Sequence, residues 1–140
     1  MKPRRDFLLA AIALHSFPLH LGAQSTFDHS HSAWDALLRQ HVKLIKDGQG
    51  HTNASQVDYK GLAQQRAALA AYLQSLSAVT PAQYAGWSKS QQYAFLANSY
   101  NAFTIEKILT RYPNLKSIRD FGNLIGNPWK DRFFTLLGQP

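Results

Sequence analysis

Residues 90–105 contain no Asp, Glu, Lys or Arg, although they lie inside a segment with the pattern of one long helix, residues 88–111. A helix without charge over such a length is normally buried on most sides. We therefore expect this helix to lie at the centre of the fold, with other helices around it. Ser88 followed by Gln91 predicts a capping box at its start, and Pro113 ends it.

Two asparagines of this helix, Asn98 and Asn101, are three residues apart and project from neighbouring points of one face. Inside a buried helix their amides need partners, because an unpaired buried polar group costs about 1–3 kcal/mol. The sequence therefore predicts a buried polar cluster of Asn98, Tyr100 and Asn101, with Tyr100 on a different face from Asn98. In one interpretation the amides orient a catalytic histidine or stabilise an oxyanion. In the other they only tie the helix to neighbouring loops.

The spacing of apolar residues predicts the remaining elements. We expect helices over residues 32–47, about 60–77 and 117–121, and a short helical turn that begins at Thr80-Pro81. Between the helices we expect a polar loop at 48–55 and an extended element at 57–59, and at the end a strand at 132–137. The prediction is an α+β fold that is predominantly helical, with the start of a small sheet at the C-terminus. A lone last strand has no partner for its backbone groups. We therefore expect a fragment of a longer protein.

The first 23 residues have the composition of an export signal. Lys2, Arg4 and Arg5 precede an apolar run over residues 7–14, and the segment ends in small residues at Ala23. Paired arginines before a modestly hydrophobic run are typical of twin-arginine leaders. The run is too short for a transmembrane helix. We therefore expect a signal peptide at 1–23, an N-terminal helix and loop at 24–56, and a periplasmic or secreted protein.

The positive charge of the chain is spread along its length. The formal net charge is +7, but the basic residues after the leader stand singly. Nucleic-acid binders usually cluster theirs, so we expect no nucleic-acid partner. A weak contact with anionic envelope components is the most that such charge supports, and the partner is otherwise unknown.

The composition also limits the chemistry. The chain has no cysteine, which excludes a disulfide, a thiolate metal site and a cysteine nucleophile within it. His29, His31, His41 and His51 follow no known ligand spacing for a structural metal. We therefore expect no metal and no cofactor, and we assign no catalytic residue.

Several motifs occur in order between Val57 and Gly138. They are Val57-Asp58-Tyr59, the string Ala-Phe-Leu-Ala-Asn-Ser-Tyr-Asn-Ala at 94–102, Tyr112-Pro113 with Ser117-Ile118, Pro128-Trp129-Lys130 and Phe133-Phe134. This order resembles the bacterial and plant family called domain of unknown function 547, with Leu96-Ala97 where Trp-Ile is more usual. The resemblance implies that residues 57–140 are a partial domain of that family.

The same resemblance implies that complete members of the family are longer than this chain. They continue beyond the point matching Gly138 with an acidic residue, a histidine and then a cysteine before paired prolines, and that cysteine is the obvious nucleophile. Whether this chain belongs to an enzyme is therefore left open. One hypothesis is an exported protein of uncharacterised function, a non-catalytic or truncated envelope domain of this family. The alternative is the N-terminal half of an exported cysteine-dependent hydrolase or peptidase-like enzyme whose nucleophile lies beyond residue 140.

Overall fold

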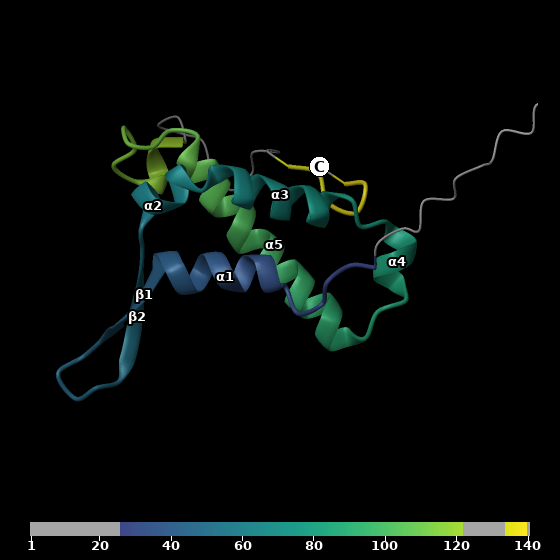
Figure 1. The fold of residues 1–140 in the computed structure, drawn as a ribbon, viewed down its shortest axis with the longest axis horizontal. Helices are drawn as coiled ribbons and strands as arrows, with labels where there is room; N and C mark the ends of the chain where they lie inside the picture. The colour runs from purple at the N-terminus through teal and green to yellow at the C-terminus, as the bar shows by residue number, and fades with distance from the viewer. Residues whose placement is uncertain (1–25, 122–133, 140) are drawn as a thin grey trace, which may run out of the picture.

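The computed structural model describes residues 26–121 and 134–139, with Ile118 and Arg119 described by their backbone only (Figure 1). The predicted signal peptide and the loop at 122–129 lie outside the described residues. The helices are α1 (Ser32–His41), α2 (Tyr59–Gln64), α3 (Arg66–Ser77), α4 (Pro81–Ala85) and α5 (Lys89–Leu109), followed by the 3₁₀ turn η1 (Ile118–Phe121). The strands are β1 (Val42–Lys46) and β2 (Thr52–Val57).

The predominantly helical α+β class is confirmed, but the sheet is not where it was expected. β1 and β2 form one antiparallel hairpin between α1 and α2. In Figure 1 this hairpin extends away from the helices. The strand predicted at 132–137 begins outside the described residues, and residues 134–139 contain an isolated bridge between Leu136 and Gln139.

The helix predicted over residues 32–47 was too long, because α1 ends at His41. Val42 already has extended backbone angles, φ −119° and ψ 123°. Val42 and Ile45 continue the apolar spacing of α1, yet β-branched residues also favour strands. The turn decides the outcome: the carboxylate of Asp47 accepts hydrogen bonds from the backbone N–H groups of Gln49 and His51, both at 2.9 Å. Part of the predicted polar loop is therefore β2.

One hydrophobic core holds the helices together. α3 packs against both α1 and α5, and α2 packs against α1 and α3. The side chains of the core come from all of these helices and from the segment after α3. They are Trp34, Leu37, Leu62, Leu69, Tyr72, Leu73, Leu76, Val79, Phe95, Ala102, Phe103, Ile105 and Leu109.

The long helix was predicted correctly in extent and in its start. α5 begins after Ser88, and both hydrogen bonds of the capping box with Gln91 are present. Its burial differs from the prediction. One face enters the core, whereas the opposite face exposes Tyr93 (75%), Leu96 (42%) and Tyr100 (54%) to solvent. Over residues 93–100 α5 is therefore buried on one side only.

The helix predicted over about 60–77 is divided at Gln65 into α2 and α3. The extended element predicted at 57–59 ends at Val57, because α2 already begins at Tyr59.

Two of the shorter elements agree with the sequence. Thr80 caps α4, and its capping box with Gln83 has both hydrogen bonds. The turn predicted at 117–121 is η1. Among the described residues, no helix is both long and apolar enough to cross a membrane.

Candidate functional site

The three residues predicted to form a buried polar cluster are not buried together. Asn98 is half-buried, whereas Asn101 and Tyr100 are exposed. At about 100° per residue, Tyr100 and Asn101 each lie more than about 90° from the core face that contains Phe95. The buried residue of this stretch is Ser99, which lies between Asn98 and Tyr100 in the sequence. The predicted cluster of Asn98, Tyr100 and Asn101 is therefore wrong as a buried unit.

Asn98 instead lines the same depression as two histidines near the start of the described residues. It lines a surface depression of about 300 Å³ together with His29, His31 and Trp34. The other lining residues are Ser30, Asp35, Leu38 and Ala94. Asn98 is thus the one predicted site residue that the fold brings next to imidazole groups.

Asp28 fixes the segment that carries the two histidines. One oxygen of its carboxylate accepts hydrogen bonds from the backbone N–H (2.9 Å) and hydroxyl (2.5 Å) of Ser30. The other oxygen accepts the same two bonds from Ser32, at 2.9 and 2.6 Å. These bonds, with the Ser30 hydroxyl first, hold the pKa of Asp28 well below its usual range. The resulting turn places His31, in a left-handed conformation (φ 51°), directly before α1.

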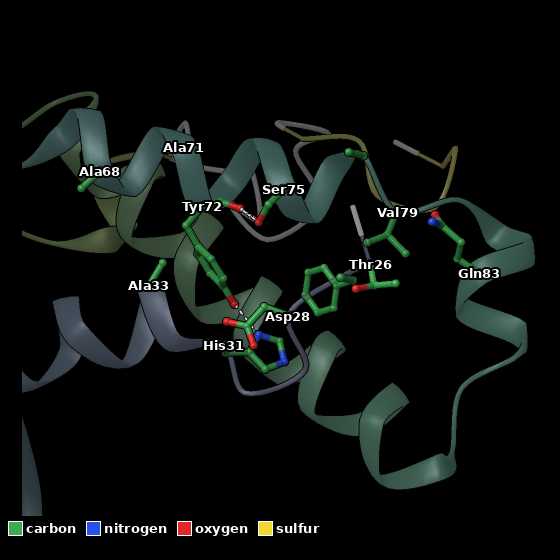
Figure 2. Close-up of a pocket in the computed structure, with 12 residues that line it drawn as sticks. Thr26, Asp28, His31, Ala33, Ala68, Ala71, Tyr72, Ser75, Val79 and Gln83 are labelled. Atoms are coloured by element: carbon green, nitrogen blue, oxygen red, sulfur yellow. Dashed lines mark hydrogen bonds between the residues drawn. The ribbon is translucent and has the colours of Figure 1, made fainter. Parts of the chain in front are cut away.

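His31 is buried against α3. Its Nδ1 lies 2.7 Å from the hydroxyl of Tyr72 (Figure 2). Burial lowers the pKa of His31 and raises the pKa of Tyr72. The pair is therefore a neutral imidazole beside a neutral phenol, and the tautomer of His31 decides which of the two groups donates the hydrogen bond. The ring of Tyr72 stacks on Trp34 at a centroid distance of 5.5 Å.

Several polar atoms around this depression are buried without a partner. His29 Nδ1, His31 Nε2 and Trp34 Nε1 have no hydrogen-bond partner among the described residues. Each such atom costs about 1–3 kcal/mol. Buried unpaired groups beside a depression are typical of sites that bind a ligand, and a neutral imidazole is suited to proton transfer. Within the described residues, no group of three or more His, Asp or Glu side chains has the geometry to hold a metal ion.

A second pocket adjoins the same histidine from the side of α3. It has a volume of about 390 Å³, and Figure 2 shows Tyr72, His31 and Asp28 close together among its lining residues. Alanines of α1 and of α3, and the alanine directly after α3, supply part of the remaining wall. They are Ala33, Ala68, Ala71 and Ala78.

The sequence did not predict these contacts. His31 and Tyr72 are 41 residues apart, and neither lies in a recognisable motif. The only signal was the His29-x-His31 pair close to the helix start. Its geometry depends on Asp28 and on packing against α3, which the sequence pattern does not specify.

A third histidine lies at the base of the hairpin. His41 is 5% exposed, and its Nδ1 is 3.8 Å from Oδ2 of Asp58. Asp58 caps α2 by accepting a 3.0 Å hydrogen bond from the N–H of Gly61. That bond is the main cause of its lowered pKa. Asp58 therefore stays ionised next to His41.

Comparisons with known proteins found no match: no family model, no curated protein and no solved structure matches this chain. The resemblance to the domain of unknown function 547 therefore remains a prediction from its motifs.

Proposed function

We propose that this chain is an exported, non-catalytic or truncated envelope domain of the family called domain of unknown function 547. The observation that carries the proposal is the exposed face of α5 formed by Tyr93, Leu96, Ala97 and Tyr100, which we call the open face. These four exposed side chains are aromatic or aliphatic, none of them is charged, and they lie on the helix that carries the family motif.

An open face of this kind is unusual for a helix at the surface of a soluble protein. Exposed helix faces normally carry charged and polar residues. Contiguous exposed apolar residues mark places where another surface packs. In complete members of the family, the segment that the resemblance places after residue 138 would cover this face, and a truncated domain leaves it open. In the complete domain α5 would then be the central, buried helix that its sequence indicates.

The open face can be tested with the double variant Tyr93→Ser/Leu96→Ser. Because both side chains are exposed, we expect the free energy of unfolding to change by no more than about 0.5 kcal/mol per substitution. We also expect less binding of 8-anilinonaphthalene-1-sulfonate, a dye that detects exposed apolar surface. Urea unfolding and dye fluorescence measure the two effects. A loss of several kcal/mol would show that these side chains are already packed, which would contradict the proposal.

Export to the periplasm or out of the cell is part of the same proposal and depends on the leader at residues 1–23. The cationic start and short apolar run support it. We expect residues 1–30 to direct a fused reporter out of the cytoplasm, and the twin-arginine pair predicts that changing Arg4 and Arg5 to Lys reduces this export. A reporter that stays in the cytoplasm would contradict export.

The second candidate function is the N-terminal half of an exported cysteine-dependent hydrolase. The observation that favours it is the depression shared by Asn98, His29 and His31, where an amide adjoins imidazoles with unpaired nitrogens. The nucleotide sequence beyond codon 140 distinguishes the two candidates. A continuing frame with cysteine, paired prolines and histidine would favour the enzyme, and a stop codon in several independent isolates would favour the non-catalytic domain.

A further inference from the structure

The base of the hairpin forms a corner with α2 that neither proposed function uses. Lys43 and Gln56 are opposite each other on β1 and β2, so their side chains share one face of the hairpin. Tyr59 and Lys60 begin α2, and Tyr112 follows α5. Together with Val57 and Asp58 they line a pocket of about 360 Å³. This volume lies in the range of small-molecule sites.

The charge of this corner is positive and not neutralised by ion pairs. Lys43 and Lys60 form no ion pair with any described residue, and each is exposed to solvent. The one carboxylate in the lining, Asp58, is engaged by the N–H of Gly61 and lies beside His41. Two lysines and one aspartate leave a net charge of +1 in the lining, 2 − 1. The two ammonium groups are therefore available to an anion.

Two aromatic side chains, Tyr59 and Tyr112, line the corner together with the lysines. The rings of Tyr59 and Tyr112 have centroids 6.5 Å apart and planes tilted by 33°. Tyr59 is half-buried, and burial raises the pKa of its phenol, so the hydroxyl stays a hydrogen-bond donor at neutral pH. Tyrosine rings offer flat apolar area at a low cost in conformational entropy. They suit a ligand with a planar ring.

We propose that this corner binds a small anion carried on a flat ring, with the anionic group at Lys43 and Lys60 and the ring against Tyr59 and Tyr112. The class is an aryl phosphate or aryl carboxylate. Lysine binds such groups as a point charge. The Gln56 amide and the tyrosine hydroxyls add hydrogen-bond donors around the same space. The proposal is independent of the open face of α5.

Phenyl phosphate is the first probe, and benzoate tests whether a carboxylate replaces the phosphate. Calorimetric titration of the full chain at low ionic strength should give saturable binding of at least one of them. Inorganic phosphate, which lacks the ring, and phenol, which lacks the charge, should bind more weakly. Lys43→Gln/Lys60→Gln should weaken binding about tenfold or more, since charged hydrogen-bond partners are lost. Circular dichroism checks that the variants remain folded.

Lys46→Gln is the matched control. It removes one positive charge from β1, the strand that carries Lys43, but Lys46 does not line the corner. It should change the affinity by less than about twofold, as expected for an exposed charge outside the site. Tyr112→Leu should remove the advantage of phenyl phosphate over inorganic phosphate. Absence of saturable binding of both aryl anions, or equal weakening by Lys46→Gln, would overturn the proposal.

Discussion

Replacing Phe95 with alanine should lower the free energy of unfolding by about 3–5 kcal/mol, the range for deleting a buried aromatic side chain. Phe95 is completely buried on the core face of α5. Its ring contacts those of Phe27, Trp87 and Tyr84, with centroid distances of 5.5, 5.3 and 5.7 Å. The substitution therefore removes packing from both the N-terminal segment and the segment containing α4. A loss of about 3–5 kcal/mol is a large part of the free energy of unfolding of a small domain.

Urea unfolding of the wild type and of Phe95→Ala measures this loss. Leu96→Ala is the matched control, because Leu96 is the next residue of the same helix but belongs to the open face. It should cost less than about 1 kcal/mol, since an exposed side chain leaves no cavity. Equal losses for the two variants would show that the two faces of α5 do not differ as described.

Gly61→Ala should have the second largest effect, at the junction of the hairpin and α2. A Cβ atom built on Gly61 would lie 2.5 Å from Oδ2 of Asp58 and 2.5 Å from Nδ1 of His41. His41 is buried, so it has little room to move. Overpacking of this kind typically costs about 1–3 kcal/mol. We expect a loss in that range, with disturbance of the cap of α2.

Gly86→Ala is the control for this prediction. The nearest atom to a Cβ at Gly86 is the carbonyl oxygen of Gln83 at 3.5 Å, an ordinary contact. Its backbone is right-handed helical, with φ −78° and ψ −6°. The substitution should be neutral or slightly stabilising, because it reduces the conformational freedom of the unfolded chain. Thermal unfolding compares the variants. A Gly61→Ala protein as stable as Gly86→Ala would contradict the described packing at the base of the hairpin.

The elements with local signals were predictable from the sequence. The Ser88–Gln91 capping box and the Thr80-Pro81 pair are signals within a few residues, and both helices begin where these signals indicate. The hairpin was missed because Val42 and Ile45 continue the helical spacing of α1, although as β-branched residues they also favour a strand. The choice between them rests on the turn around Asp47 and on pairing with β2.

The burial of α5 and the candidate site depend on contacts between distant parts of the chain. The absence of charge at residues 90–105 predicted an apolar helix, but not how many neighbours cover it. α3 covers one side, so Asn101 and Tyr100 remain exposed while Asn98 borders the depression. The pairing of His31 with Tyr72 joins residues 41 positions apart, which no spacing rule detects in a single sequence.

The central claim is that α5 presents a buried face and an open apolar face in the same helix. Hydroxyl-radical footprinting of the full chain, read residue by residue by mass spectrometry, tests it most directly. We predict strong modification of Tyr93 and Leu96 and protection of Phe95 between them. Protection of all three side chains, or modification of Phe95 to the same degree as Tyr93, would contradict this account.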